Sequence, residues 1–226
     1  MINRISVEKA EKKPRKVERQ TQAQRSSNTQ EKICNATLEV LAEVGHNCIS
    51  TALIAKKAKV SRGALTHQYA SRNDLLVAAL RRLHNDWSQL RPFTEDSRKE
   101  SYSLSRLIEE LWDNLFSDKR YIASLELMLA ARLDTDLGVR LREEMVRWVK
   151  MRDDFILNLQ FSAKEPRLTD QHVHLLMASL RGIAMYQIFD KDMQAGKNLV
   201  ELYKSIIENN NMSDSEENSY SIVVSE

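Results

Sequence analysis

The sequence has few of the residues that interrupt helices. It contains five glycines and three prolines among 226 residues, and Pro14, Pro92 and Pro166 lie far apart. Proline removes a backbone donor and clashes with the preceding helical turn, so segments without it can form long helices. A hydrophobic content of 42% is enough for a compact core in a chain of this length. The composition therefore favours a helical globular protein.

Cysteines and long apolar segments are equally scarce. Cys34 and Cys48 form neither a Cys-x-x-Cys pair nor a disulfide framework. We expect both to be buried thiols in a reducing compartment. No apolar run approaches the length of roughly 18 residues that spans a bilayer, and residues 1–20 lack the apolar core of a signal peptide. We therefore expect a cytoplasmic protein with no membrane partner.

The net charge of +2 is small, but charge is distributed unevenly along the chain. Residues 1–27 carry eight Lys and Arg against three Glu, whereas residues 209–226 carry four acidic residues and no basic one. Both segments are poor in large apolar residues and are predicted to be disordered. A basic arm is usually only solvated, but beside a DNA-binding module it adds attraction to phosphates.

Between these arms, apolar residues recur at intervals of three and four, which is the period of a helix. We find no alternating strand pattern, and the predicted fold class is all-α, with about nine helices. Gly45 is expected to end the first helix, and Thr169 to cap a later one. The predicted helices outside the region described next cover 29–45, 104–116, 121–133, 136–161, 169–189 and 196–208. The stripe expected in 121–133 consists of Ile122, Leu125, Leu129 and Leu133.

A pair of short helices is predicted upstream of residue 76. Ser50 or Thr51 can cap the first, which runs to about Ala58. A tight turn follows at residues 59–61, and Ser61 caps the second helix. A short helix, a tight turn and another short helix form the helix-turn-helix unit. The second helix is expected to turn Ala64, Leu65 and Tyr69 inward and Arg62, Gly63, Thr66, His67 and Gln68 outward.

The outward residues suit contact with DNA. The second helix of such a unit enters the major groove N-terminus first, where its backbone approaches the bases closely. Gly63 costs about 1 kcal/mol of helix propensity, but it removes the side chain that would block this approach. Arg62 can reach guanine O6 and N7, and Thr66, His67 and Arg72 are suited to hold phosphates.

Residues 51–76 read "TALIAKKAKVSRGALTHQYASRNDLL". With the preceding helix, this segment resembles the DNA-binding module of the TetR family of bacterial transcriptional regulators, whose usual pattern is "T...IA..AGVS.GTLY.YF.SKE.L". Lys59 replaces the family's turn glycine, so either Lys59 adopts the turn conformation or the turn differs slightly. Thr66 and Gln68 replace aromatic phosphate contacts, and Tyr69 replaces a core phenylalanine. The residues predicted to bind DNA are Thr51, Ser61, Arg62, Gly63, Ala64, Thr66, His67, Gln68 and Arg72.

The resemblance implies an organisation for the whole chain. Residues 28–76 would form the DNA-binding domain, and residues 77–208 a helical domain for effector binding and dimerisation. Members of the family are homodimers that pair their last two long helices into a four-helix bundle and hold a small molecule among the middle helices. The expected function is repression of transcription at a palindromic operator, relieved by a small-molecule effector. An activator on the same fold remains an alternative.

Aromatic residues and methionines in the middle segment suggest where the effector binds, although such residues at helical spacing more often form plain core. Arg132, Arg181 and Gln187 are possible polar anchors. A moderately hydrophobic or aromatic effector is expected. The candidate effector pocket consists of Trp112, Phe116, Met128, Met145, Trp148, Met151, Phe155, Met177 and Tyr186.

No catalytic, cofactor or metal motif is found. His172 and His174 are two residues apart, on different faces of a helix, and cannot readily share a metal. The sequence has no HExxH motif, nucleophile elbow or glycine-rich phosphate loop, so we do not expect an enzyme. The remaining alternative is a helical protein-interaction module whose DNA-binding head is degenerate.

Overall fold

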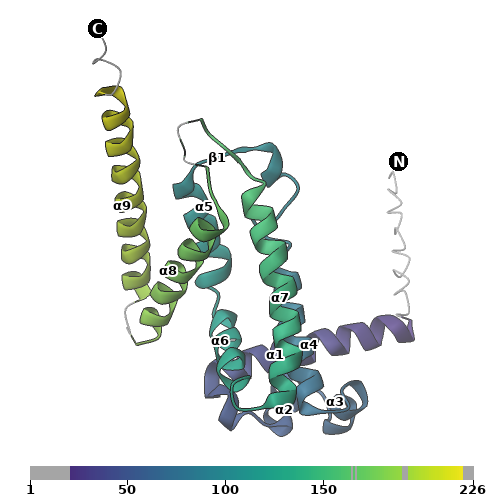
Figure 1. Cartoon of the computed structure of the whole chain (residues 1–226). Coiled ribbons are helices and arrows are strands. Elements are labelled where there is room, and N and C mark those ends of the chain that lie inside the picture. The colour runs from purple at the N-terminus through teal and green to yellow at the C-terminus, as the bar shows by residue number, and fades with distance from the viewer. Residues whose placement is uncertain (1–20, 164, 166, 190–192, 221–226) are drawn as a thin grey trace, which may run out of the picture.

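The computed structural model describes residues 21–163, 165, 167–189 and 193–220. This part of the chain folds into nine α-helices, so the predicted all-α class is confirmed. Helices α1 to α3 gather at one end, α7 stands upright above them, and α8 and α9 form a pair along one side (Figure 1). The helices are α1 (Gln22–Cys48), α2 (Thr51–Ala58), α3 (Arg62–Gln68), α4 (Arg72–Trp87), α5 (Leu104–Leu111), α6 (Arg120–Ala130), α7 (Thr135–Leu157), α8 (Asp170–Phe189) and α9 (Met193–Tyr220).

Helix α1 begins earlier than the sequence analysis predicts. The Thr21 hydroxyl accepts a hydrogen bond from the Gln24 backbone N–H, and the Gln24 side chain accepts one from the Thr21 N–H. This reciprocal capping box starts a helix in a polar segment without apolar periodicity. Residues 22–27 of the predicted arm therefore have a helical backbone, while residues 1–20 lie outside the described part.

Gly45 turns the chain as predicted. Its φ of 75° and ψ of 168° interrupt the helical backbone of α1, a conformation that glycine adopts at little cost. The chain resumes a helical course for residues 46–48 before α2 begins. The end of α1 is thus reoriented relative to its long N-terminal part.

Helix α9 extends further than predicted. Its backbone is helical to Tyr220, which includes residues 209–220 of the predicted acidic tail. Residues 221–226 lie outside the described part.

Two very short strands pair in parallel, although the sequence shows no strand pattern. Ser101 and Tyr102 form β1, and Gln160 and Phe161 form β2. Two residues are too few to produce a readable alternation. The chain also contains a 3-10 turn, η1 (Ser97–Lys99), and a π-helical turn, η2 (Trp112–Phe116), which directly continues α5.

The buried face of α6 differs from the predicted stripe. Leu129 is 57% exposed and Leu133 is 90% exposed. Helix α6 ends at Ala130, so Leu133 lies in the turn before α7. Packing against both α1 and α7 favours small residues on the covered side of α6. Its buried residues are Tyr121, Ala123, Ser124, Leu127 and Ala130.

Helix α4 joins the N-terminal head, which consists of α1 to α3, to the rest of the protein. It packs against α1 on one side and α7 on the other, and buries Leu76, Leu80 and Leu83 completely or nearly so. The predicted domain boundary at residue 76 therefore falls inside a continuous helix. The two parts share one hydrophobic core.

The two cysteines have different surroundings. Cys34 on α1 is buried, as expected, whereas Cys48 is exposed, which contradicts the expectation. Cys48 lies at the end of α1, after the turn at Gly45, where the chain leaves the core. Both thiols are free.

Candidate nucleic-acid interface and ligand cavity

The turn between α2 and α3 has the geometry that its sequence requires. The Ser50 hydroxyl caps α2 by accepting a hydrogen bond from the Leu53 N–H at 3.3 Å. Lys59 then adopts the left-handed conformation, with φ 55° and ψ 42°. Of the two possibilities left open by the sequence, the structure shows the first, in which lysine takes the turn conformation in place of glycine. A side chain in this region costs about 1 kcal/mol or more, so the turn is slightly strained.

Helix α3 presents a polar face to solvent. The Ser61 hydroxyl accepts a hydrogen bond from the Ala64 N–H at 3.0 Å, and Leu65 is buried against the head. Arg62, Gly63, Thr66 and His67 are exposed, as predicted. The Thr66 hydroxyl donates to the backbone carbonyls of the first turn, at 3.1 and 3.2 Å.

Gly63 has free space around it. A Cβ built at this position would meet nothing nearer than the Ser61 hydroxyl oxygen, at 3.9 Å. Folding of this chain therefore does not require glycine here. The missing side chain leaves the α3 backbone open to an external surface, which is the arrangement expected for close approach to DNA.

Gln68 and Tyr69 attach the end of α3 to α1. The Gln68 amide nitrogen donates to the Ser26 hydroxyl at 3.2 Å, and its oxygen accepts from the Gln30 amide at 3.0 Å. Gln68 is half-buried, so it is less free for a phosphate than its predicted outward position implies. The Tyr69 hydroxyl lies 3.1 Å from the Cys34 sulfur, and burial raises the pKa of Tyr69. Tyr69 thus packs within the head, as predicted.

The remaining predicted contacts lie around this face. Thr51 is half-buried in the first turn of α2, and Ala64 is half-buried on α3. Arg72 is exposed, but its guanidinium donates to the His46 carbonyl at 2.7 Å. This bond holds the start of α4 against the end of α1. Arg72 therefore has a structural partner as well as a position near the head surface.

Two lysines near α3 were not singled out by the sequence reasoning. Lys56 and Lys59 are exposed, and like Arg62 they have no carboxylate partner within ion-pair distance among the described residues. Lys57 differs, since its amine pairs with Glu43 at 2.5 Å and with Glu39 at 3.3 Å. An unpaired cation on a solvent-facing head is a candidate phosphate contact. The sequence could have indicated Lys56 and Lys59, because residues 55–62, "AKKAKVSR", contain four basic residues in eight.

Comparison with known proteins identifies the module. Residues 33–79 match the family model "Bacterial regulatory proteins, tetR family". The chain is 31% identical to the HTH-type transcriptional regulator CymR of Pseudomonas putida over 185 residues, which cover 78% of this chain and 87% of that protein. The chain belongs to the TetR family. It is a DNA-binding transcriptional regulator with a helix-turn-helix head.

Solved structures show the same fold in TetR proteins of low sequence identity. A putative TetR-family transcriptional regulator from Rhodococcus sp. superposes with a TM-score of 0.58 at 20% identity, covering 79% of this chain and 98% of that one. The multidrug binding protein EbrR complexed with ethidium superposes with a TM-score of 0.55 at 20% identity, with the same coverage of 79% and 98%. At this identity the likeness concerns the fold.

Five of the predicted pocket residues of this TetR regulator meet around one small cavity of about 20 Å³. The cavity lies among α4, η2, α6, α7 and α8, and its wall also contains Ser124 and Leu115. The five are Phe116, Met128, Met145, Trp148 and Met177, and their new neighbours include His84, Trp87, Tyr121, Arg152 and Arg181.

The other four predicted pocket residues lie elsewhere. Trp112 is buried towards α9, where a Cβ at Gly196 would come 3.0 Å from its ring. Phe155 packs beneath the Arg98 guanidinium, 4.3 Å from the ring centroid. Met151 borders two open hollows on the α7 surface, and Tyr186 is 54% exposed on α8. These four were selected as aromatic residues or methionines, and residue type alone could not show which of them meet the cavity.

His84 contributes a buried neutral ring to the cavity wall. It stacks on Trp148 with ring centroids 4.9 Å apart and an interplanar angle of 10°. Burial lowers the pKa of His84 to about 4, although Glu144 beside it acts in the opposite direction. Glu144 is itself buried and bonded to Arg81 at 3.0 Å, which helps to hold the Glu144 pKa below its usual range.

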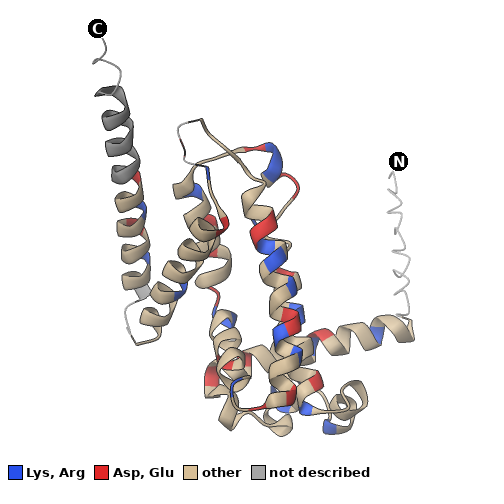
Figure 2. Ribbon diagram, in the orientation of Figure 1, with Lys and Arg blue, Asp and Glu red and all other residues tan. Residues whose placement is uncertain are grey.

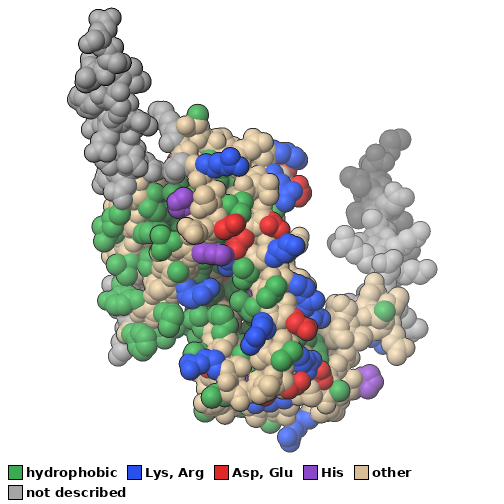
Figure 3. Space-filling model, viewed as in Figure 1, with side chains coloured by type: hydrophobic (Ala, Val, Ile, Leu, Met, Phe, Trp, Pro, Cys, Tyr) green, Lys and Arg blue, Asp and Glu red, His purple; other side chains and the backbone are tan. Residues whose placement is uncertain are grey.

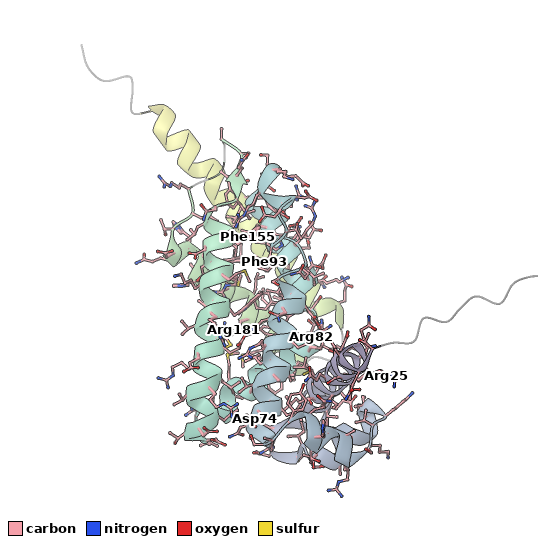
Figure 4. All side chains as sticks on the ribbon, turned by 90° about the vertical axis from the view of Figure 1, so that its right-hand side faces the viewer. Arg25, Asp74, Arg82, Phe93, Phe155 and Arg181 are labelled. Atoms are coloured by element: carbon pink, nitrogen blue, oxygen red, sulfur yellow. The ribbon has the colours of Figure 1, made fainter. Side chains whose placement is uncertain are left out.

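The polar anchors considered in the sequence analysis separate in the fold. Arg181 lines the cavity, Gln187 lines a wider groove, and Arg132 is exposed beyond α6. The groove has a volume of about 470 Å³ and lies between α1, α6 and α8. Figure 4 shows Arg181 at mid-height, above Asp74 and the head and below Phe93 and Phe155.

The described residues contain no group of three His, Cys, Asp or Glu side chains arranged to hold a metal ion. His172 contacts Thr169 near the start of α8, whereas His174 lies 3.2 Å from an Asp153 oxygen. None of the helices in the described part combines the length and apolar character of a bilayer span.

Proposed function

We propose that this TetR-family regulator is a cytoplasmic repressor. It binds a near-palindromic operator as a homodimer and leaves the operator when a small molecule occupies the cavity beside Arg181. The observation that carries the DNA-binding part of the proposal is the exposed face of α3, where Arg62 has no ion-pair partner among the described residues and Gly63 faces open space.

The proposed DNA contacts have two roles. Arg62 donates to guanine in the major groove, and the open backbone at Gly63 permits the approach. Thr66, His67, Lys56 and Lys59 then contact phosphates, which fix the orientation without reading sequence. Thr51, Ser61, Ala64, Gln68 and Arg72 complete the predicted set, with Gln68 and Arg72 acting mainly by holding α3 and α4 against α1.

The proposed dimer surface is the outer face of α8 and α9. Leu175, Met185 and Phe189 are exposed on α8 at helical spacing, and Phe189 is 86% exposed. Leu202 and Ile206 are exposed on α9. Figure 3 shows hydrophobic side chains gathered on this side of the molecule. An exposed apolar stripe of this kind marks a surface that a partner covers, and a second copy offers a self-complementary one.

The scarcity of charged residues on α8 also supports its assignment to the dimer surface. In α8, Asp170 and Arg181 are the only residues that are Asp, Glu, Lys or Arg. Figure 2 shows this helix almost entirely tan, whereas α7 carries many charged residues. Charged residues are depleted at the centre of protein interfaces because burial removes their hydration. The two heads of a dimer could then reach successive major grooves about 34 Å apart.

The proposed release mechanism runs through α6. Tyr121, Ser124 and Met128 on this helix line the cavity. On the same helix, Glu126 accepts a hydrogen bond from the His46 backbone N–H at 2.8 Å, next to the turn at Gly45. A ligand that moves α6 would therefore pull on the end of α1. It can weaken operator binding only by as much as its affinity differs between the two conformations.

A second connection joins α7 to the start of α4. Arg140 donates to Asp74 at 2.6 Å, and the Asn73 amide donates to Asp136 at 2.9 Å. Met145 and Trp148 lie further along α7 and line the cavity. Helices α6 and α7, which both contact the head or the start of α4, thus also form part of the cavity wall. The structural similarity to EbrR, a multidrug binding protein complexed with ethidium, supports a small-molecule site in this domain.

The test begins with selection of bound duplexes from a random DNA pool, followed by anisotropy titration with the enriched duplex and unrelated competitor. We expect a two-fold symmetric sequence and a complex containing two chains. Arg62→Ala should reduce the affinity about 10- to 100-fold for the selected duplex and much less for unrelated DNA. Arg142→Ala, which removes an exposed arginine from α7, is the matched control.

Failure to enrich any sequence would contradict the proposal and favour the protein-interaction alternative. The sign of regulation follows from a reporter placed behind the selected duplex. A repressor lowers transcription from it, whereas an activator raises transcription.

A further inference from the structure

Arg181 is a cation without a carboxylate. Its Nε donates to the Tyr121 hydroxyl oxygen at 3.1 Å, and no acidic side chain of the described residues lies within ion-pair distance of its guanidinium. The other charges near the cavity are paired: Arg152 bonds Asp153 at 2.7 Å, and Glu144 bonds Arg81 at 3.0 Å. The cavity wall therefore carries one uncompensated positive charge.

Tyr121 adds a second donor beside this charge. Its hydroxyl oxygen already accepts from Arg181, and its own proton has no acceptor among the described residues. Burial raises the pKa of Tyr121, even though Arg181 acts to lower it, so the phenol keeps its proton at neutral pH. A guanidinium and a neutral hydroxyl side by side form a donor pair that suits the two oxygens of a carboxylate.

The rest of the wall is largely aromatic. His84 and Trp148 are stacked, the rings of Trp87 and Tyr121 lie 6.0 Å apart, and the rings of Phe116 and Tyr121 lie 4.8 Å apart. These rings surround the cavity that Arg181 also lines. Flat apolar walls of this kind favour an aromatic ligand through offset and edge-to-face contacts.

We propose that the ligand of this cavity is an aromatic carboxylate, with its carboxylate held by Arg181 and Tyr121 and its ring packed among Trp87, Trp148 and Phe116. This inference rests on the proposed function, because it names the chemical class of the effector. The unpaired guanidinium of half-buried Arg181 disfavours a cationic aromatic ligand, and a neutral one would supply no counter-charge.

The cavity must enlarge to admit such a ligand. Its volume of about 20 Å³ holds little more than one water molecule, whereas sites for organic ligands usually exceed about 300 Å³. Met128, Met145 and Met177 border the cavity from α6, α7 and α8, and methionine side chains rearrange readily. Displacement of Met128 acts on the helix whose Glu126 holds the end of α1. Ligand entry and release of the head thus involve the same helix.

The test compares ring-matched probes of different charge. Benzoate and 2-naphthoate are titrated by calorimetry into the full-length protein, alongside benzamide, 2-naphthamide and benzylamine. At least one of the two carboxylates should bind about tenfold or more tightly than its amide, since hydrogen bonds to charged groups are the stronger ones. Benzylamine should bind more weakly than either. Carboxylates that bind no more tightly than their amides would overturn the inference.

Variants test whether Arg181 is responsible for the preference for carboxylates. Arg181→Met should reduce the affinity for the carboxylate to that of the amide, while Arg181→Lys should retain part of the preference. Arg132→Met, which removes an exposed arginine outside the cavity, is the matched control and should bind like the parent protein. Melting curves confirm that each variant is folded. A carboxylate preference that survives Arg181→Met would contradict the assignment.

Operator binding distinguishes this inference from the proposed function. If the ligand-free protein binds its selected duplex but shows no carboxylate preference, the regulator remains and the ligand class is wrong. If it prefers carboxylates but binds no DNA selectively, the cavity assignment stands and the regulatory function fails. We expect a bound carboxylate to weaken operator binding. Unchanged operator affinity at saturating carboxylate would overturn its role as effector.

Discussion

The exposed face of α3 and the outer face of α8 each contain a glycine that the chain itself does not require. A Cβ at Gly63 would meet only a hydroxyl oxygen at 3.9 Å, and a Cβ at Gly182 would meet nothing within 4 Å. Gly138 differs, because a Cβ there would lie 2.5 Å from the Ala131 carbonyl oxygen. A helical glycine with free space costs stability without serving the fold of one chain. Both faces therefore suit close approach by something outside the chain.

The side chains around the two glycines indicate different partners. Gly63 is flanked by Arg62 and lies near exposed lysines, which suit a polyanion. Gly182 lies between exposed Leu175 and Phe189 on a helix with almost no charge, which suits an apolar protein surface. Under the proposed function both open glycines lie on contact surfaces, and the neighbouring side chains determine the type of partner.

The largest expected effect comes from a charge at the centre of the α8 face. Gly182→Glu should leave the monomer folded, since the position has space, but two like charges would oppose each other across a two-fold interface. Sedimentation should show a monomer. Operator affinity should fall about 100- to 10,000-fold, because one head loses the effective concentration supplied by the second.

Leu133→Glu is the control for that variant. It introduces the same charge at a residue that is 90% exposed but lies in the turn after α6, away from the α8 face. It should remain dimeric and bind the operator normally. A dimeric Gly182→Glu protein would show that the outer face of α8 is not the interface.

Acid should destabilise the region between the two faces. Burial lowers the pKa of His84 from 6.5 to about 4, so the unfolded chain binds this proton first. The stability from neutral His84 is complete above about pH 6.5 and is lost as the pH falls towards 4, by up to about 3 kcal/mol. Urea unfolding near pH 7 and near pH 5 measures the difference.

His84→Phe keeps a ring against Trp148 but cannot titrate, so its stability should change less between these two pH values. His172→Gln alters an exposed histidine and should behave like the parent protein. If His84→Phe and the parent lose the same free energy of unfolding, acid acts through groups other than His84.

Gly63→Ala should separate stability from function in the head. The helix should gain about 0.5 to 1 kcal/mol of stability, because alanine restricts the unfolded chain and meets no neighbour. Operator affinity should nevertheless fall about tenfold or more, since the added methyl holds the α3 backbone away from the bases. An affinity equal to that of the parent would mean that this part of α3 does not approach DNA closely.

The smallest effect is expected at Lys59, where the turn is strained without a sequence-specific contact. Lys59→Gly should raise the free energy of unfolding by about 0.5 to 1 kcal/mol, because glycine adopts a φ of 55° without steric cost. Lys56→Gly removes the same charge from the interior of α2 and should lower the free energy of unfolding by about 1 kcal/mol. Equal effects of both variants would show that backbone strain at Lys59 is negligible.

Local signals in the sequence were sufficient to predict the helix-turn-helix. Ser50 and Ser61 cap their helices through hydrogen bonds between residues three positions apart. In the turn between these helices, only Lys59 adopts a strained, left-handed conformation. The same kind of local signal was overlooked at Thr21, where Gln24 completes a capping box in a polar segment. Such features depend on neighbours in the chain, so the sequence contains all the information needed to find them.

The cavity could not be found in that way. Arg181 and Tyr121 are sixty residues apart, and the sequence offered Arg181 only as one of three possible anchors. Periodicity assigned an apolar face to α6 but chose Leu129 and Leu133, which are exposed. Each middle helix has apolar residues on more than one side, so the pattern alone does not show which side faces the cavity.

By itself, the sequence determined the helical class, the family and the solvent-facing side of α3, because these follow from caps, turns and helical spacing within short segments. Only the tertiary structure decided which rings and methionines converge, that Arg181 lacks a carboxylate, and that Glu126 links α6 to the end of α1. Those properties depend on the packing of helices distant in the chain, which fixes the neighbours of each buried charge.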